Sequence, residues 1–213
     1  MQEKFWKQRW QQKKIGFHAD KVNTHLKKYL NQTGNIENFT TLLPLCGKTI
    51  DLLFLSKQCS NVIGVELISQ AVTEFFQENN LDAIQNKNYY EYKNIKVFLE
   101  DYFKVTTEHI PNVDLIYDRA ALVALPEDMR KNYAQHNLSL MKIGSKILLI
   151  TLEYPQDKKS GPPFSVTTLE VQKLYAGQCS ITLLESIDLK TKNDKMSDLS
   201  FINEKVYLIE KIK

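Results

Sequence analysis

The stretch TLLPLCGKTIDLLFL, residues 41–55, joins an apolar run to a Gly-Lys-Thr triplet and then to a second apolar run. The triplet matches the end of the phosphate-binding pattern G-x-x-x-x-G-K-[ST]. That pattern needs a glycine five residues before Gly47, where this chain has Leu42. Pro44 also removes a backbone N–H donor, and the neighbouring leucines close off the space for phosphate oxygens. The stretch therefore predicts a strand, a loop for a ligand that is not polyanionic, and a helix.

Strands and helices alternate from this stretch to the C-terminus. The expected strands are 39–45, 61–67, 95–101, the start of 113–122, 145–154, 179–189 and 204–212. The expected helices between them are 49–58, 69–80, 126–141 and 167–177. Strands separated by helices form parallel βαβ units, and the last two strands, with no helix between them, can form a hairpin. The predicted fold class is α/β, with a seven-stranded mostly parallel sheet, one antiparallel strand and helices on both faces.

Capping residues mark several expected helix ends. Asp20 is a candidate N-cap for a helix over 20–30, and Ser69 is a candidate N-cap for 69–80. Thr167 and Glu170 form the capping-box pattern. Gly144 follows the helix expected over 126–141, where glycine commonly ends a helix.

The segment before the first strand is expected to be helical and amphipathic. FWKQRW, residues 5–10, spaces aromatic and basic side chains three and four apart, so that they share helix faces. We expect residues 1–38 to form a lid-like segment of one domain that spans residues 1–213. A chain of this length is large enough for a sizeable core.

Composition excludes several classes of function. The net charge of +3 is too small to indicate nucleic-acid binding by charge alone. Apolar runs such as ILLITL, 147–152, are too short to cross a membrane, and the N-terminal residues have no apolar core of a secretory signal. The three cysteines and four histidines have neither disulfide-framework nor metal-ligand spacing. We therefore expect a monomeric cytoplasmic protein with no metal, no membrane partner and no nucleic-acid partner.

Charged residues follow the expected strands at the edge where ligands bind in open α/β sheets. Glu66 lies about twenty residues after the first loop, the spacing of a carboxylate that accepts hydrogen bonds from ribose hydroxyls. Glu100 and Asp101 follow the third strand, and either could accept a hydrogen bond from an exocyclic amine or form a solvated turn. Arg119 ends the fourth strand and could bind an anionic group or pair with Asp118.

The first loop has a single glycine, Gly47, where a dinucleotide fold has G-x-G-x-x-G. Close approach of a pyrophosphate is therefore not expected. A nucleoside bound through its ribose and base fits better, and S-adenosylmethionine is the common ligand of that description.

Six motifs now resemble one known family in order and spacing. They are FWKQRW…IGFH (5–18), LLPLCGKTIDLLFL (42–55), VIGVELISQAV (62–72), YDRAALVALP (117–126), LLITLEYPQ (148–156) and GPPFSV (161–166). The chain resembles the thiopurine S-methyltransferase family over nearly its whole length. This resemblance implies the Rossmann-like class I methyltransferase fold, S-adenosylmethionine as cofactor and a small-molecule thiol as methyl acceptor.

The resemblance also implies roles for residues at matching positions. Those expected to bind the cofactor are Trp10, Leu45 and Gly47 beside its methionine part, Glu66 at the ribose, Asp101 and Tyr102 at the adenine end, and Arg119 at the crevice. Those expected at the acceptor are Phe17 and Phe164, the latter in the apolar loop GPPF with Pro162 and Pro163. A basic residue is expected within 190–201, where Lys192 or Lys195 can replace the arginine that the family pattern leads us to expect.

The implied chemistry is direct attack of a thiolate on the activated methyl group, with Arg119 favouring the thiolate. We name no general base, because aromatic thiols ionise readily. Cys46 and Trp6 are interpreted as structural. A selenium, tellurium or other small-molecule acceptor and a non-catalytic nucleoside-binding module remain as alternatives. A nucleic-acid methyltransferase is disfavoured, because YDRAAL stands where such enzymes carry a D/N-P-P-Y/F signature.

Overall fold

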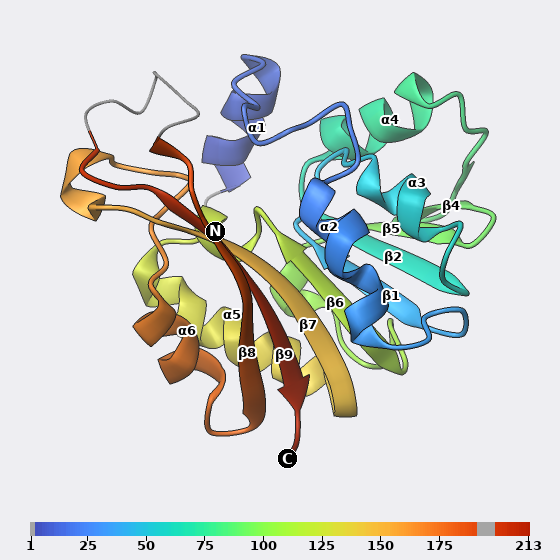
Figure 1. The fold of residues 1–213 in the computed structure, drawn as a ribbon. Coiled ribbons are helices and arrows are strands. Elements are labelled where there is room, and N and C mark those ends of the chain that lie inside the picture. The colour runs from blue at the N-terminus through green and yellow to red at the C-terminus, as the bar shows by residue number, and fades with distance from the viewer. Residues whose placement is uncertain (1–2, 191–198) are drawn as a thin grey trace. The chain divides into compact units, whose positions relative to one another are not determined.

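The computed structural model describes residues 3–190 and 199–213 (Figure 1). The chain divides into two compact units, Met1–Ile116 and Tyr117–Lys213, and strand β6 (Val113–Arg119) begins in the first and ends in the second. Lys192 and Lys195, the lysines that can replace the expected arginine within 190–201, lie outside the described residues. Our expectation of one domain with a lid over 1–38 stays a prediction.

The first unit is a twisted sheet with helices packed against it (Figure 1). Its strand order is β3-β4-β5-β2-β1-β6. The strands are β1 (Thr40–Pro44), β2 (Asn61–Glu66), β3 (Ile84–Gln85), β4 (Tyr89–Tyr92) and β5 (Ile95–Leu99). The helices are α1 (Glu3–Gln11), α2 (Thr24–Tyr29), α3 (Asp51–Leu55) and α4 (Ser69–Glu78), with short 3-10 turns η1 (Leu30–Thr33) and η2 (Tyr102–Lys104).

Parallel pairing joins β1 to β2, β2 to β5 and β1 to β6. Strands β1 and β2 are buried along nearly their whole length, as expected for parallel strands covered on both faces. Helix α4 packs against β2 and β5, with Val72, Phe75 and Phe76 buried. This arrangement brings the carboxyl ends of β1, β2 and β5 to one edge of the sheet.

The second unit is a sheet in which the last strand lies in the middle. Strand β9 (Asn203–Lys211) lies between β7 (Met141–Glu153) and β8 (Cys179–Asp188) and pairs antiparallel with both (Figure 1). Helices α5 (Glu127–Leu140) and α6 (Thr168–Tyr175) contact each other, and they cover β7 and β8 respectively. Short turns η3 (Leu122–Ala124) and η4 (Gln156–Lys158) connect these elements. The expected C-terminal hairpin is confirmed.

The predicted α/β class with a mostly parallel sheet is confirmed, but the described residues form nine strands and not seven. The two further strands, β3 and β4, pair with each other and with β5 in antiparallel fashion. Their residues are exposed or half-buried, so the sequence there contains no apolar run.

Three of the predicted helix caps are wrong. The helix expected from Asp20 begins at Thr24, because the Asn23 side chain accepts hydrogen bonds from the backbone N–H groups of His25 and Leu26. Ser69 is the first residue of α4, whose N-cap is Ile68. Gly144 lies inside β7 with φ +85°, since this strand follows α5 with no intervening loop.

Thr167 is confirmed as the N-cap residue of α6, while the Glu170 carboxylate accepts hydrogen bonds from Arg130. The Thr167 hydroxyl accepts a hydrogen bond of 3.1 Å from the Glu170 N–H.

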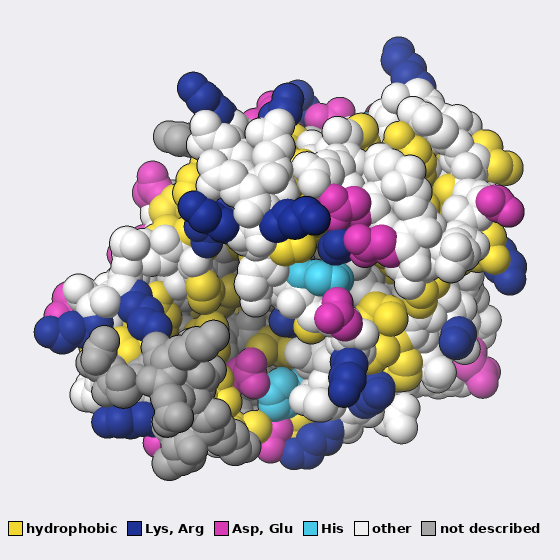
Figure 2. All heavy atoms as spheres, turned by 90° about the horizontal axis from the view of Figure 1, so that it is seen from above, with side chains coloured by type: hydrophobic (Ala, Val, Ile, Leu, Met, Phe, Trp, Pro, Cys, Tyr) yellow, Lys and Arg dark blue, Asp and Glu magenta, His cyan; other side chains and the backbone are white. Residues whose placement is uncertain are grey.

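On the face drawn in Figure 2, basic and acidic side chains are interspersed with apolar ones. No helix in the described parts of the chain combines the length and the apolar character needed to cross a bilayer.

Candidate cofactor site

The carboxyl ends of three parallel strands build the candidate site in the first unit. Strand β1 ends at Pro44 and β2 at Glu66, and the backbone of Glu66 pairs with Leu99 at the end of β5. In open α/β sheets this edge is where ligands bind. The topology therefore brings together the loops that carry Gly47, Glu66 and Asp101.

Glu66 ties the first loop to the end of β2. Its Oε2 atom accepts a hydrogen bond of 2.8 Å from the Gly47 N–H, and its Oε1 atom accepts one of 2.8 Å from the Ile68 N–H. The residue is 7% exposed, and burial raises the pKa of its carboxyl group although these N–H donors oppose the rise. The two carboxylate oxygens together can accept about four hydrogen bonds, and the N–H groups of Gly47, Ile68 and Leu67 provide three, so an acceptor position is compatible with a ribose hydroxyl. Glu66 therefore fits the expected ribose-binding role.

The backbone of the first loop is in an unusual conformation. Leu45 has φ +48° and Gly47 has φ +54°. The left-handed region is unfavourable for a leucine by about 1–2 kcal/mol. A β-carbon on Gly47 would lie 3.3 Å from Cζ2 of Trp10. Glycine at this position thus allows the backbone to pass close beneath the indole.

Aromatic residues from the N-terminal segment cover this loop. Trp10 is 2% exposed and packs with Ile68 and Ala71 at the start of α4. Its ring meets that of Phe17 edge-on, with 5.9 Å between the centroids. Trp6 meets Phe17 in the same manner at 5.8 Å, which supports the interpretation of Trp6 as a packing residue.

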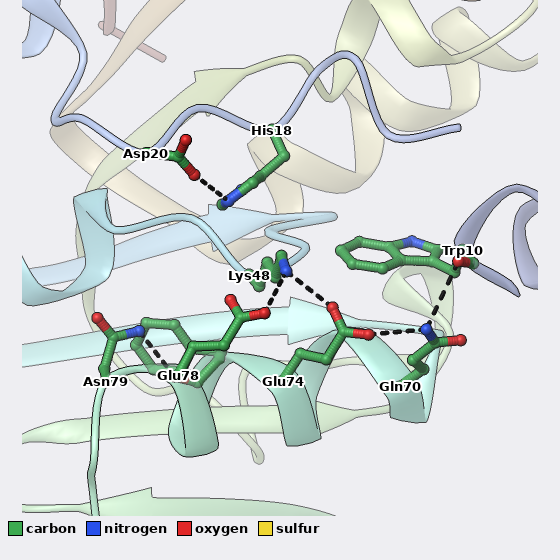
Figure 3. A network of polar contacts seen from close by, with 9 residues as sticks. Trp10, His18, Asp20, Lys48, Gln70, Glu74, Glu78 and Asn79 are labelled. Atoms are coloured by element: carbon green, nitrogen blue, oxygen red, sulfur yellow. Dashed lines mark hydrogen bonds and ion pairs between the residues drawn. The ribbon is translucent and has the colours of Figure 1, made fainter. Parts of the chain in front are cut away.

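The Lys48 side chain is directed to helix α4. Its ammonium lies 2.8 Å from Glu74 Oε2 and 2.6 Å from Glu78 Oε1, both on α4 (Figure 3). A phosphate-binding loop needs this lysine to reach the phosphates. The position of Lys48 therefore agrees with the prediction that this loop does not bind a polyanionic ligand.

Cys46 is a packing residue. It is buried with its Sγ against the backbone of Gly64, where a β-carbon would lie 2.7 Å from the sulfur. Burial, and then the charge of Glu66, raise the pKa of the Cys46 thiol well above its usual value. Because the thiolate is the nucleophilic form, this thiol is poorly suited to attack.

Asp101 is connected to the end of β2 by a backbone hydrogen bond of its neighbour Glu100. The Glu100 N–H donates to the Glu66 carbonyl at 3.0 Å, and Asp101 caps the turn η2 by accepting from the Phe103 N–H at 3.1 Å. Tyr102 is buried. The predicted adenine-end residues thus follow the strand that adjoins Glu66.

Arg119 ends β6 in the second unit. Its neighbour Asp118 is buried, accepting a hydrogen bond from the Leu122 N–H at 3.0 Å and one from the Tyr133 hydroxyl at 2.7 Å. Burial raises the pKa of Asp118 to about 6. Successive side chains on a strand point to opposite faces, so Arg119 is directed away from the face that Asp118 occupies. Ala120 follows with φ +61°, a second strained non-glycine residue at the end of a parallel strand.

The GPPF loop is held within the second unit by residues that the sequence did not single out. The Phe164 N–H donates to the Val123 carbonyl at 2.6 Å, and the Tyr154 hydroxyl donates to the Pro163 carbonyl. Buried Arg130 lies 5.8 Å from the Phe164 ring centroid. Arg130 also donates to Ser165 and to both carboxylate oxygens of Glu170. The only sequence signal for these contacts was the capping box that contains Glu170.

No cluster of three or more His, Cys, Asp or Glu side chains in the described ranges could hold a metal ion.

Solved structures of similar fold include a 1,6-didemethyltoxoflavin-N1-methyltransferase from Burkholderia thailandensis with bound S-adenosylhomocysteine. It has a TM-score of 0.67 at 12% identity, and the match covers 99% of this chain and 87% of that one. The N-methyltransferase NodS from Bradyrhizobium japonicum, also with S-adenosylhomocysteine, has a TM-score of 0.63 at 12% identity over 88% and 84% of the two chains. At 12% identity these likenesses show the fold, which this chain shares with two methyltransferases that were solved with S-adenosylhomocysteine.

The family follows from sequence comparison. The family model for thiopurine S-methyltransferase matches residues 1–212. A thiopurine S-methyltransferase from Photobacterium profundum is 41% identical over 99% of both chains, and one from Pseudomonas aeruginosa is 40% identical over 99% of this chain and all of that one. The chain belongs to the thiopurine S-methyltransferase family, and the resemblance drawn from its motifs is confirmed.

Proposed function

We propose that this enzyme transfers the methyl group of S-adenosylmethionine to the sulfur of a small-molecule thiol. The observation that carries the proposal is the buried Glu66 carboxylate at the strand edge. It holds the Gly47 loop and can still accept a hydrogen bond from the ribose of the cofactor. The names of the 40% and 41% identical relatives support a thiopurine-like acceptor.

The cofactor is proposed to bind along the strand edge of the first unit. Glu66 accepts the ribose hydroxyls, Leu45 and Gly47 pass the methionine part, and Asp101 with Tyr102 holds the adenine end. Trp10 packs on the bound cofactor and excludes water from it. When bound, S-adenosylmethionine supplies a methyl group that is already activated on a sulfonium sulfur.

The remaining residues are proposed to serve the acceptor. Arg119 favours the thiolate over the thiol by its positive charge and also contacts the cofactor. Phe17 and Phe164 hold the acceptor through apolar contacts, so that it meets the methyl group in one orientation. Such alignment can lower a barrier by on the order of 7–11 kcal/mol.

The proposal is tested by transfer of a labelled methyl group to a panel of acceptors. The panel contains 6-mercaptopurine, thiophenol and their oxygen analogues, with S-adenosylmethionine saturating. We expect label on the thiols only, lying on sulfur by mass spectrometry. Label on the oxygen analogues, or on a selenium compound to the exclusion of every thiol, would replace the proposed acceptor class.

We also propose a monomer in the cytoplasm. All three cysteines are free and buried, which suits a reducing compartment. Light scattering on the purified protein tests the oligomeric state, and a dimer mass would contradict it. Microscopy of the tagged protein in its own host tests the location.

A further inference from the structure

The lysine of the Gly-Lys-Thr triplet is almost buried and doubly paired. Its side chain is 9% exposed, and its ammonium bonds to Glu74 and Glu78, which are four residues apart on α4 (Figure 3). Two carboxylates at this spacing on a helix repel each other. Lys48 offsets that repulsion, and hydrogen bonds to the two glutamates raise its pKa although burial acts to lower it. This ammonium is therefore held in place as a cation.

Lys48 also immediately follows Gly47, the residue that lies beneath Trp10. The Gly47 N–H is held by Glu66 on one side of the loop. On the other side, the Lys48 side chain holds the loop to α4. The path of the loop backbone past the cofactor position is thus fixed from β2 and from α4 together.

The same ion-pair network reaches the N-terminal segment. Glu74 Oε1 accepts a hydrogen bond of 2.7 Å from Gln70 Nε2, and Gln70 Nε2 lies 3.5 Å from the Trp10 carbonyl oxygen. Trp10 itself packs on Ile68 and Ala71 of the region where α4 begins. Figure 3 shows Trp10 and Lys48 beside this helix, which carries Gln70, Glu74 and Glu78. Helix α4 is therefore a common support for the loop and for the aromatic residue that covers it.

We propose that Lys48 is a positioning residue for the cofactor, fixing the Gly47 loop and the Trp10 cover on α4 at the same time. The inference rests on the proposed assignment of Gly47 and Trp10 to the cofactor site. Lys48 acts through its neighbours and contacts no reacting atom. Its loss loosens both sides of the cofactor position while leaving the acceptor residues in place.

The first experiment measures the dissociation constant of S-adenosylhomocysteine by calorimetry in Lys48→Met. We expect the constant to rise about tenfold, within the usual range for coupling between neighbouring sites. The KM for S-adenosylmethionine rises similarly, while kcat at saturation stays within about twofold. The matched control is Lys205→Met, because Lys205 pairs with Glu153 at 2.6 Å and is 14% exposed, in the second unit. If both variants lose stability but bind like the wild type, Lys48 is only a structural ion pair and the proposal is overturned.

A charge exchange tests the ion pair itself. The double variant K48E/E78K keeps Glu74 and its hydrogen bond from Gln70 and moves the cation onto α4, so we expect affinity to return to within about threefold of the wild type. Failure to restore binding would overturn ion pairing as the cause.

Tryptophan fluorescence tests whether the loss of Lys48 loosens the packing of Trp10 over the Gly47 loop. The chain has two tryptophans, so Trp6→Phe leaves Trp10 as the sole emitter. In that background Lys48→Met is expected to increase acrylamide quenching of Trp10, and Lys205→Met is not. Unchanged quenching in both would contradict the link between Lys48 and the cover.

Two further variants separate this inference from the site assignment. Trp10→Ala and Glu66→Gln report on the cofactor site alone. Normal binding in both variants would overturn the site itself. Weak binding in both, with normal binding in Lys48→Met, would overturn only the role of Lys48.

Discussion

The Gly47 N–H donates a 2.8 Å hydrogen bond to the Glu66 carboxylate across nineteen residues of sequence. This bond joins the loop after β1 to the end of β2, so the acid proposed to bind the ribose also fixes the backbone proposed to pass the methionine part. One side chain thereby sets the relative position of two proposed cofactor contacts.

Glu66→Gln is expected to weaken cofactor binding. The amide keeps one acceptor oxygen, but its NH2 group opposes the N–H of either Gly47 or Ile68. Loss of a hydrogen bond to a charged group costs about 1.5–3 kcal/mol, so the dissociation constant for S-adenosylhomocysteine should rise about tenfold to a hundredfold. Calorimetry measures it, with half-buried Glu91→Gln on β4 as the control. Equal affinity in the wild type and Glu66→Gln would remove Glu66 from the site.

Gly47→Ala is expected to disturb both backbone and cover. The positive φ strains an alanine by about 1–2 kcal/mol, and the new β-carbon meets Trp10 at 3.3 Å. Gly144→Ala is the matched control, because Gly144 also has positive φ but nothing lies within 4 Å of its β-carbon position. Thermal unfolding should show a similar backbone cost in both variants. Only Gly47→Ala should also lose cofactor affinity, and equal affinities would show that the contact with Trp10 is irrelevant to binding.

Asp118 is expected to make stability depend on pH. Burial raises its pKa from 3.8 to about 6, so the folded protein binds this proton more tightly than the unfolded chain. The free energy of unfolding therefore falls as pH rises from about 4 to about 6, by roughly 3 kcal/mol from this residue. Urea titrations of the wild type and Asp118→Asn across this window isolate the effect by difference. Parallel curves for the two proteins would contradict it.

Arg119→Ala is expected to reduce turnover at least about tenfold without unfolding the protein, because the thiolate loses a favourable charge. Arg130→Met provides the contrast. Its loss leaves Glu170 without its buried partner and lowers the free energy of unfolding by about 3 kcal/mol. Steady-state kinetics with circular dichroism distinguish the two variants. Wild-type kinetics in Arg119→Ala would remove this residue from the scheme.

Most of the fold could be predicted because buried parallel strands have nearly continuous apolar sequences. Strands β1 and β2 satisfy this rule along nearly their whole length. The β3–β4 hairpin could not be found, since its residues are exposed or half-buried and show no apolar periodicity. The start of α2 was missed for a tertiary reason. The Asn23 N–H bonds to Asp51 at 2.9 Å, which helps to fix the cap at Asn23 and not at Asp20.

Some residues of the candidate site could likewise be predicted from the sequence, and some contacts could not. Glu66 and Asp101 could be predicted as site residues because Glu66 ends β2 and Asp101 lies just after β5, and topology brings the ends of parallel strands together. The partners of Lys48 lie 26 and 30 residues further along the chain, so their contact depends on where α4 packs. The spacing of Glu74 and Glu78 on one helix face was the only local sign that a cation was needed there.

The central position of β9 has a consequence for biosynthesis. Strand β8 pairs with β9, and β9 pairs with β7, so β8 has no place in the sheet until β9 has been made. The ribosome delivers residues up to Asp188 before this strand, leaving the facing edges of β7 and β8 unpaired. Such edges are templates for pairing with other chains. Completion of the second unit must therefore wait for β9 to emerge, and nascent chains stalled before it are the form most exposed to aggregation.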